Sequence, residues 1–530
     1  MWVFVFFPVA IGVMAADAIG QDPIPVPLTA IDPAGNSSAT DIETPRRGIE
    51  FVDFDAAPPA PAEFTLEDRI RQLEQQFSVQ QSEAELLRNR LAEISTANEK
   101  QPDPKSFKAG WKNQLTFESA DKNFTAHIGG RTQIDTIWLQ DSAAFGVGNG
   151  AGDGDAVDFR RARFRMEGTM YKTVEYTYEY DFVNSVNDNV GLQPASSSNV
   201  INVAVPTDLY WTFHEIAWVG NVRVGNQKEP IGLEHLTSSR FLDFMERSFN
   251  QDAYTGPFNN GFTPGVSIYN NFGEDKRGLW QVGVFKNIVN GFTYGIGDGG
   301  YAVDGRLAYL LWDECEGRRL LHLAGSYSHR DPLNDAIRIR SRASLRNGPG
   351  ALNPLMVETG NFLADSQDML AAEMAMVLGS FQLQSEYIVS SATNARDTAN
   401  TVNYGTYLSD GYYVMASYFL TGEHREYEKK SGAFGRVVPH QNSHLFSSDC
   451  GKRGWGAWQI LARYSSLNLN DGALQGGQVA DWTLGINWFL NPNMKIQANY
   501  VYTDRNSLGS PTSPGAGVIH GFGMRLAHDF

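Results

Sequence analysis

The 530-residue chain lacks several features that define common protein classes. It contains only two cysteines, Cys315 and Cys450, which are too few for a disulfide scaffold and match no zinc-site spacing. A single disulfide between them would fit an oxidising compartment. Beyond the first residues no apolar run reaches 18 residues, which excludes a protein that crosses a membrane with helices. Positive charge is also scarce: the formal net charge is −17, which argues against nucleic acid as a partner.

The chain opens with MWVFVFFPVAIGVMAADAIG, a short apolar run that ends in small residues. The run is too short to span a bilayer as a helix, and Ala16-Asp17-Ala18 resembles a signal-peptidase site. Residues 1–18 are therefore predicted to be a signal peptide. No Lys or Arg precedes the run, so the true start codon stays open. Residues 19–65 contain eight prolines among polar residues, which predicts an extended, disordered linker.

Residues 66–95 follow a heptad pattern. Alternating spacings of four and three residues predict a coiled coil that self-associates, as a trimer or a dimer. The alternative is an amphipathic helix packed on its own chain. The seam consists of Leu66, Ile70, Leu73, Phe77, Gln80, Ala84, Leu87, Leu91 and Ile94.

From about residue 107 to residue 530 the period changes to two. Segments of roughly ten residues alternate apolar with polar or small side chains, and clusters of Gly, Asn, Asp and Pro separate them. A soluble β-sandwich would show the same alternation. Aromatic residues on the apolar face, the absence of a helical pattern and the terminal Phe530 favour a transmembrane β-barrel.

In such a barrel the apolar face of each strand meets lipid and the other face lines the lumen. Residues 161–182 are expected to form a hairpin in which Arg163 and Arg165 pair with Glu175 and Glu179. Arginines with fewer acids near them in sequence are expected to stay available to a passing anion. The predicted lumen residues are His127, Arg131, Gln133, Asp135, Arg161, Arg163, Arg165, Glu167, Glu175, Glu179 and Asp181, with Arg160 just beyond the strand end.

Residues 337–346 read IRIRSRASLR, with arginine at alternate positions. An extended strand would place Arg338, Arg340, Arg342 and Arg346 on one surface, with Ser344 leaving one slot neutral. Like charges at this spacing repel unless water or an anion compensates them. Such a row in a narrow wet pore attracts anions and excludes cations.

Across residues 107–530 the sequence resembles the phosphate-selective porin O and P family of bacterial outer membranes. The resemblance rests on several segments taken in order: FTAHIGGRTQID, VDFRRARFRMEGTMYK, VRVGNQKEPIGLEHLTSSRFLDFMERS, IRIRSRASLR, GAWQILARYSSLNL and DWTLGINWFLNPNMKIQANYVYTD. It implies a barrel of about sixteen antiparallel strands, a trimer of pores, and a loop, here around residues 237–262, that folds inward to narrow each pore.

The resemblance also implies an anion track of arginines along the pore. Matched motif by motif, the track comprises Arg131, Arg160, Arg161, Arg247, Arg338, Arg340, Arg342 and Arg346. Lys122 keeps one of the family's pore lysines, whereas His127, His235 and Glu175 stand where lysines are expected, and Pro230 replaces an expected acid. These departures favour a general anion preference over high phosphate specificity.

The sequence thus predicts a passive porin of the bacterial outer membrane for small anions, phosphate among them. Two alternatives are a general porin for neutral solutes, for which Tyr210 and Trp218 would provide aromatic platforms, and a barrel anchor that contacts the cell wall through the coiled coil. A pure anchor has no need of an arginine row. No catalytic triad stands out, the spacing of His440 and His444 suits a metal only on a helix, and neither a metal, a cofactor nor an enzymatic activity is expected.

Overall fold

A computed structural model describes residues 65–98, 106–111, 113–141, 154–183, 204–256, 261–287, 297–347, 353–446, 454–506 and 516–530. The predicted signal peptide, nearly all of the linker and Cys450 lie outside these residues. Residues 1–94 and 95–530 form two separate units, which are described one at a time.

The first unit holds most of helix α1 (Leu66–Asn98). The carbonyl of Thr65 accepts the backbone N–H of Arg69 at 3.2 Å, which begins the helix. The apolar seam positions are exposed: Leu66 is 79% exposed and Phe77 63%. The predicted coiled coil stays a prediction, since a single chain carries no partner helix. None of the described helices is both long and apolar enough to cross a membrane.

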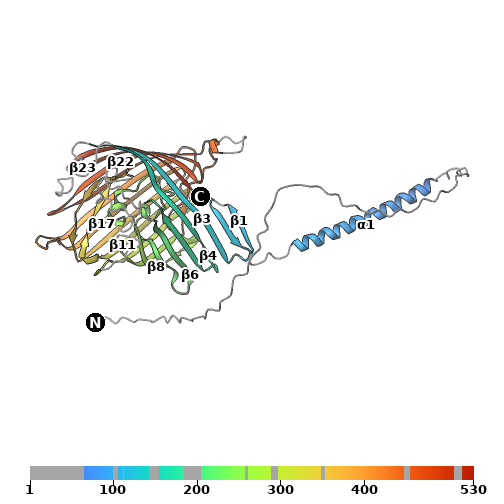
Figure 1. Cartoon of the computed structure of the whole chain (residues 1–530), viewed down its shortest axis with the longest axis horizontal. Coiled ribbons are helices and arrows are strands. Elements are labelled where there is room, and N and C mark those ends of the chain that lie inside the picture. The colour runs from blue at the N-terminus through green and yellow to red at the C-terminus, as the bar shows by residue number, and fades with distance from the viewer. Residues whose placement is uncertain are drawn as a thin grey trace, which may run out of the picture. The chain divides into compact units, whose positions relative to one another are not determined.

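Sixteen antiparallel strands of the described residues close into one ring (Figure 1), which confirms the predicted barrel. The ring closes where β24 pairs with β3, from Ile519 opposite Asp141 to Asp529 opposite Arg131. Closure pairs each ring strand with a neighbour on both sides, so no ring strand is left as an open edge of the sheet. The ring strands are β3 (Phe124–Asp141), β4 (Gly154–Met170), β5 (Val174–Asp181), β6 (Val205–Ile216), β7 (Gly220–Lys228), β8 (Phe262–Phe272), β9 (Gly278–Lys286), β10 (Tyr301–Glu314), β11 (Arg319–Asp331), β16 (Ser366–Leu378), β17 (Phe381–Asp397), β18 (Asn403–Phe419), β21 (Ala457–Asp471), β22 (Leu474–Asn491), β23 (Met494–Asn506) and β24 (Gly517–Asp529).

A hairpin outside the ring, β1 (Phe107–Trp111) with β2 (Leu115–Ser119), extends the wall at this seam. Strand β2 pairs with the first residues of β3, Leu115 opposite Ile128, just beyond the end of β24. The amide of Asn493 donates to the carbonyl of Asn113 in the hairpin turn at 2.8 Å and so ties the hairpin to the ring. The barrel unit therefore begins with two strands that are not part of the closed wall.

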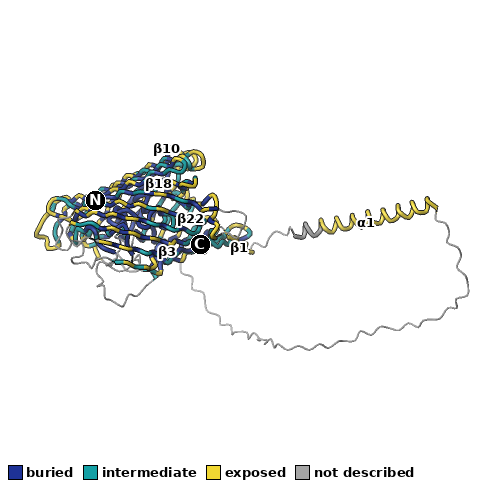
Figure 2. Tube along the Cα trace, turned by 90° about the horizontal axis from the view of Figure 1, so that it is seen from above, coloured by how far each residue is buried: buried dark blue, intermediate teal, exposed yellow. Residues whose placement is uncertain are grey.

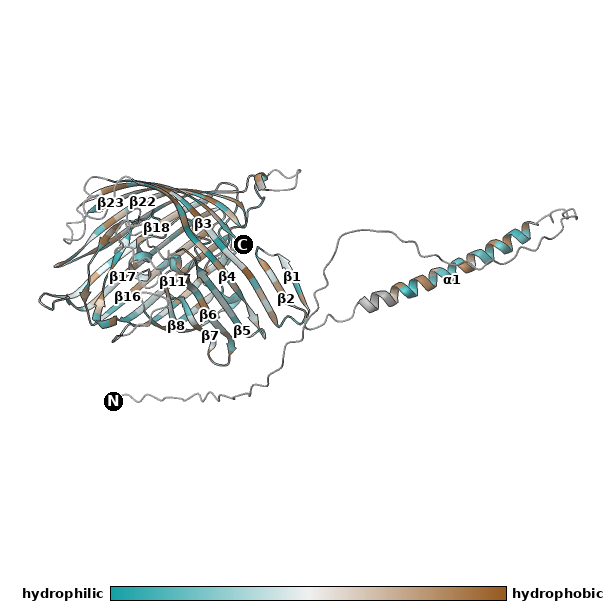
Figure 3. Ribbon diagram, in the orientation of Figure 1, coloured by the Kyte–Doolittle hydropathy of each residue, from teal (hydrophilic) through white to brown (hydrophobic). Residues whose placement is uncertain are grey.

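Side chains alternate along the ring strands as the sequence predicts (Figures 2 and 3). In β10, for example, Asp304 and Arg306 are buried inside the barrel, whereas Val303 and Leu307 are exposed on its outside. Polar side chains thus gather in the lumen, and an apolar surface faces outward.

The two ends of the barrel differ. At the turn end, where Phe530 lies, most connections contain two to five residues, but one spans residues 420–456. At the loop end the connections are mostly longer, and two of them, 229–261 and 332–365, carry elements of their own. The further elements are α2 (Leu233–Leu236), η2 (Gln251–Thr255), η4 (Glu274–Lys276), η5 (Leu333–Asp335), β12 (Ala336–Ile337), β13 (Arg340–Arg342), β14 (Leu355–Glu358), β15 (Phe362–Leu363), β19 (Tyr427–Glu428), β20 (Ala433–Phe434) and η7 (His444–Phe446).

The outward face provides a test of its expected contact with lipid. Leu307 lies in the middle of β10 and is 56% exposed. Leu307→Arg should lower the free energy of unfolding of the barrel in lipid vesicles by about 2–4 kcal/mol, because a charge would enter hydrocarbon. Thr398→Arg, in the exposed connection after β17, should change it by less than about 0.5 kcal/mol. Equal effects of the two variants, measured by urea unfolding in vesicles, would contradict a lipid-facing position for Leu307.

Candidate functional site: the charged lumen

Residues 229–256, between β7 and β8, fold into the barrel and are called the inward segment here. It begins earlier than the predicted 237–262. The carboxylate of Glu386 on the wall accepts the backbone N–H of Glu234 at 2.6 Å, and Gly232 turns the chain there with φ of 78°. A Cβ on residue 232 would lie 2.8 Å from that carboxylate, so the turn requires glycine.

Four carboxylates of the inward segment bind arginines that lie far away in the sequence at distances of 3.3 Å or less. These carboxylates, called the acidic anchors here, are buried, and so are their partners except for Arg342, which is half-buried. Each pair therefore holds the segment at a fixed place against the wall or against the 338–346 segment. The pairs are Glu229 with Arg330 (2.6 Å), Glu234 with Arg463 (3.3 Å), Glu246 with Arg160 (2.8 Å) and Arg525 (2.9 Å), and Asp252 with Arg342 (2.6 Å).

Glu246 is the most heavily shared anchor. Besides Arg160 and Arg525 it has Arg346 at 3.8 Å and Arg161 at 3.9 Å. Burial alone would raise the pKa of Glu246, but these four guanidiniums hold it well below its usual range. The carboxylate is therefore ionised at neutral pH, and its contribution to stability is lost only as the pH falls below the ordinary glutamate range.

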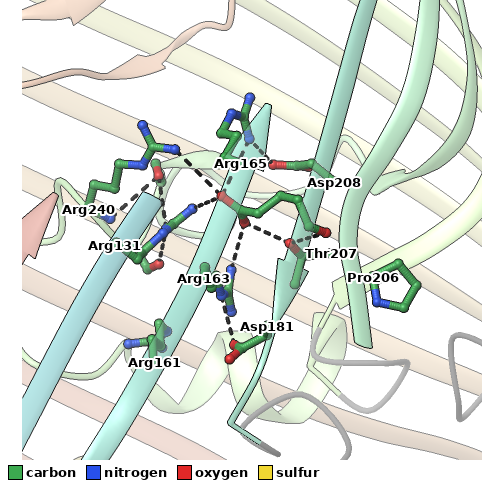
Figure 4. A network of polar contacts seen from close by, with 12 residues as sticks. Arg131, Arg161, Arg163, Arg165, Asp181, Pro206, Thr207, Asp208 and Arg240 are labelled. Atoms are coloured by element: carbon green, nitrogen blue, oxygen red, sulfur yellow. Dashed lines mark hydrogen bonds and ion pairs between the residues drawn. The ribbon is translucent and has the colours of Figure 1, made fainter. Parts of the chain in front are cut away.

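The β4–β5 hairpin carries a second network (Figure 4), and its pairing confirms the predicted hairpin. Glu179 accepts from Arg131, from Arg163 at 3.2 Å and from Thr207 at 2.7 Å. Arg163 also donates to Asp181 at 2.8 Å. The guanidiniums of Arg165 and Arg240 lie 3.7 and 3.6 Å from the same Glu179 carboxylate.

The predicted role of Glu175 in this hairpin network is wrong. Glu175 lies at the turn end of β5, opposite Thr169, too far along the strand to reach Arg163 or Arg165. It instead contacts Lys430 at 2.5 Å and His214 at 3.1 Å. Alternation predicts which face of the strand a side chain lies on but not which residue lies opposite it. Arg163 and Arg165 lie opposite Asp181 and Glu179 instead, farther from the hairpin turn.

Arg131, Arg160 and Arg161 have buried partners in the lumen, although few acids lie near them in the sequence. Arg131 pairs with Glu179, Arg160 with Glu246, and Arg161 donates to Gln133 at 2.8 Å. Arg160 faces inward beside Arg161 because β4 bulges there: Gln133 pairs with Arg161 and the next residue of β3 pairs with Phe159.

A space on the turn-end side of the inward segment, called the inner cavity here, measures about 410 Å³. Nine basic side chains and five carboxylates from the described residues line it, an excess of four positive charges with histidine neutral. The basic side chains are Arg131, Arg161, Arg163, Arg165, Arg223, Lys228, Arg240, Arg247 and Lys430, and the carboxylates are Glu167, Glu175, Glu179, Asp208 and Glu428.

Three basic residues of the inner cavity have no carboxylate within 4 Å among the described residues. Lys228 and Arg247 both bind carbonyl oxygens around helix α2, Lys228 at 2.5 Å from that of His235 and Arg247 at 2.7 Å from that of Thr237. Burial, together with nearby Arg163 and Arg160, lowers the pKa of Arg247 to about 10, so it stays charged at neutral pH.

Arg223 is the third. It donates to Thr212 Oγ1 at 3.1 Å and to the hydroxyl of Tyr269 at 3.2 Å, and its guanidinium lies over the ring of Tyr210 at 4.2 Å. Hydroxyls and rings orient these cations without neutralising them.

The predicted row at 338–346 lies in the connection between β11 and β16, not in the barrel wall. Ile337 and Ile339 are buried while Arg338 and Arg340 are half-buried, so the alternation holds as far as Arg342. Residues 343–346 are all buried, so the alternation ends there. The prediction that Arg346 lies on the same surface as Arg338, Arg340 and Arg342 is therefore wrong.

The row stands at the rim of a second space of about 440 Å³, called the outer cavity here, on the loop-end side of the inward segment. Arg330, Arg338 and Arg340 line it with one carboxylate, Asp331. Arg342 and Arg346 point to Asp252 instead, at 2.6 and 3.2 Å. Burial of Asp252 is more than offset by these guanidiniums, which keep its pKa below the usual range. The predicted track therefore divides between two cavities, with the acidic anchors between them.

The remaining predicted residues take varied positions. Lys122 lies in an exposed turn before β3, and His127 lies half-buried in β3 opposite Glu167. His235 lines the inner cavity, where burial and then Lys228 and Arg247 keep its pKa well below the usual range. The predicted inward position of Trp218 is wrong, because it lies fully exposed in the turn after β6. No cluster of three or more metal-ligating side chains occurs in the part of the chain described.

Sequence reasoning missed the contribution of residues 420–446. This stretch enters the barrel from the turn end and lines the inner cavity with Glu428, Lys430 and Phe434. Arg306 of β10 holds it by donating to the carbonyl of Gly432 at 3.0 Å. The only available signal was the interval of 37 residues between β18 and β21, which is too long for a turn.

Comparison with known proteins gives three findings. The family model described as phosphate-selective porin O and P matches residues 127–530. Porin O of Pseudomonas aeruginosa is 26% identical over 444 residues, 79% of this chain and 91% of the relative. An uncharacterised protein of Caulobacter vibrioides is 28% identical over 403 residues, 74% of this chain and 71% of the relative.

Among solved structures, the anion-selective porin from Comamonas acidovorans resembles the chain at 14% identity and a TM-score of 0.44, over 77% of this chain and all of that one. A likeness at that level carries no inference about function or assembly.

The acidic anchors yield a test. Glu246→Gln should leave the closed wall intact but release the middle of the inward segment, because Arg160 would keep a buried charge without its carboxylate and Arg525 would keep only its pair with Asp135. Loss of one partner of a buried ion pair costs about 3–5 kcal/mol. Current through single channels should therefore become noisier, and the barrel should unfold at lower temperature in detergent. Glu314→Gln, which breaks an exposed pair with Arg319, is the matched control. Quiet, wild-type-like currents from Glu246→Gln would contradict the anchoring role.

Proposed function

Because the chain belongs to the phosphate-selective porin O and P family and forms a porin of the bacterial outer membrane, we propose that its pore prefers small anions, phosphate and other small oxyanions among them. The excess of four positive charges around the inner cavity carries this proposal. A cation excess in a narrow wet lumen raises the local concentration of anions and repels cations. Permeation needs no cofactor and follows the concentration gradient.

The predicted anion track extends this proposal along the lumen. From the loop end, Arg338, Arg340, Arg342 and Arg346 lead to Arg160 and Arg161 and then to Arg247 and Arg131. Pairing with a carboxylate uses only part of a guanidinium's five N–H groups. The buried Nε–H groups of Arg131, Arg161 and Arg346 have no hydrogen-bond partner among the described residues. An anion that passes them could accept these bonds.

Two observations bear on the choice of solute. A porin for neutral sugars would present free aromatic faces, but Arg223 covers Tyr210 and also lies 5.0 Å from the Tyr269 ring centre, and Lys228 lies 5.8 Å from that of Phe262. Glu175 and the neutral His235 stand at pore positions where the family carries lysine, as the sequence comparison implied. We therefore infer a general preference for small anions, with phosphate as one substrate.

We also propose that the porin assembles as a trimer and that α1 contributes a coiled coil to the assembly. Its seam leaves large apolar side chains exposed, such as Leu73 at 61% and Leu91 at 65%, and burial against two further copies would remove them from water. The predicted proline-rich linker and this helix could additionally contact the cell wall, since the turn end of an outer-membrane barrel faces the periplasm.

Charge selectivity tests the first proposal. In a planar bilayer under a KCl gradient, the zero-current potential of the wild-type pore should show anion preference. Arg223→Gln removes a cation that carboxylates do not neutralise and should lower the anion-to-cation permeability ratio roughly threefold to fivefold. A variant with both Arg338→Gln and Arg340→Gln removes positive charge from the outer cavity and should also lower the permeability ratio of the pore.

The matched control for this experiment is Arg319→Gln, which removes the same charge at the exposed turn end. It should leave the potential unchanged. A wild-type pore that prefers cations would show that the carboxylates dominate the lumen and would overturn the proposal.

Deletion tests the second proposal. Removal of residues 66–95 should weaken the oligomer in detergent without abolishing the folded barrel, because none of the ring strands lies in that region. The mass of the complex by light scattering and the heat-dependent gel shift of the folded barrel report the two properties. A deletion of equal length within residues 19–65 is the control. Loss of folded barrel, or an unchanged oligomer, would contradict the role of α1.

A further inference from the structure

A second, much smaller space lies beside the inner cavity and is called the narrow space here. Its volume is about 20 Å³, which is room for about one water molecule. Pro492 and Asp529 are among the residues that line it, so it leads toward the turn end of β22, β23 and β24. Arg131, Arg240 and Phe241 line both spaces and therefore lie at the boundary between them.

Phe241 is the apolar member of this boundary, and its ring packs differently from the other phenylalanines of the inward segment. Phe244 and Phe249 are buried in apolar clusters with side chains of the wall. The ring of Phe241 is half-buried and lies over the guanidinium of Arg436 at 5.3 Å. Such a contact is weak where water has access to it. The ring of Phe241 can therefore turn without disrupting an apolar core.

The backbone of Phe241, in contrast, is fixed on both sides. Its N–H donates to the carbonyl of Ser238 at 2.9 Å, and its own carbonyl accepts from Arg425 at 2.8 Å. Arg425 belongs to residues 420–446, so the stretch that enters from the turn end holds the inward segment at this point. Motion at the boundary is thus confined to the side chain of Phe241.

The charges of the narrow space favour an anion over a cation. Lys495 has no carboxylate within 4 Å among the described residues and donates to the carbonyl of Leu242 at 2.8 Å, whereas Arg436 pairs with Asp529. An ion that arrives from the inner cavity therefore meets an excess of positive charge, but a hydrated ion does not fit while the ring stays in place. One carboxylate, Asp529, lines the narrow space together with five basic side chains: Arg131, Arg240, Arg425, Arg436 and Lys495.

We propose that Phe241 sets the size limit for anions that leave the inner cavity toward the turn end beside β22–β24. When its ring turns aside, the two spaces join and a small anion passes the boundary. A larger organic anion such as gluconate is held back, because the ring stays within the passage it has opened. This rests on the proposed anion preference of the pore and adds to it a residue that selects by size.

The test varies the size of residue 241 in the full-length porin in a planar bilayer. Two values are measured: the conductance in KCl, and the permeability of gluconate relative to chloride, from the zero-current potential between KCl and potassium gluconate. Phe241→Ala should raise the conductance roughly twofold and the permeability ratio about threefold to fivefold, because the passage widens. Phe241→Leu should give intermediate values, and Phe241→Trp should lower both values below those of the wild type.

Phe249→Leu is the matched control for Phe241→Leu. It makes the same change in the same segment, but Phe249 lines neither space, so both values should stay unchanged. Wild-type values in Phe241→Ala would overturn the inference. Equal rises in the two leucine variants, or a rise in Phe241→Trp, would also overturn it, because loosening of the inward segment would then explain the change.

Failure of the proposed function gives a different result. A wild-type pore that prefers cations, but whose conductance still follows the size of residue 241, would refute the anion preference and keep Phe241 as the size limit. An anion-selective pore whose conductance and gluconate permeability ignore residue 241 would keep the proposed function and refute this inference.

Discussion

The buried contacts between the acidic anchors and their arginines are the interaction on which the lumen depends. A ring of sixteen strands is too wide for its own side chains to fill, so its interior must be built from segments that fold inward. Water can satisfy the polar backbone of such segments, but it cannot hold them at one position, so they need direct contacts with the rest of the barrel. Guanidiniums of the wall and of the 338–346 segment provide those contacts, and Glu246, with Arg160, Arg161 and Arg525 of the wall and Arg346 of that segment, is the centre of the arrangement.

The same contacts decide how much charge a solute experiences. Carboxylates neutralise much of the positive potential of the arginines that hold the inward segment. Arginines held by carbonyls, hydroxyls or aromatic rings are not neutralised in this way. Arg223 and Arg247 belong to the second kind. Residues of identical type thus differ in how far carboxylates neutralise them, and a count of arginines alone would overestimate the positive charge of the lumen.

Much of the fold could be predicted because lipid outside and water inside impose alternation on every wall strand. The inward faces of Arg131, Arg163 and Glu179 follow from that constraint alone. The partners could not be predicted, since Glu246 and Arg525 are 279 residues apart and meet only through the inward segment. The entry of residues 420–446 into the lumen could not be predicted either, because the alternating pattern identifies strands but gives no information about the connections between them.

The bulge at Arg160 has a consequence for how the chain can change length. It shifts the alternation of β4 by one residue, so the loop-end part of the strand runs in the opposite phase to the part from Arg161 onward. Deleting one residue between 155 and 159 would restore regular alternation and turn Arg160 toward the bilayer, away from Glu246. An insertion or deletion of a single residue in this half of the strand would therefore place the charged side chain of Arg160 in the bilayer.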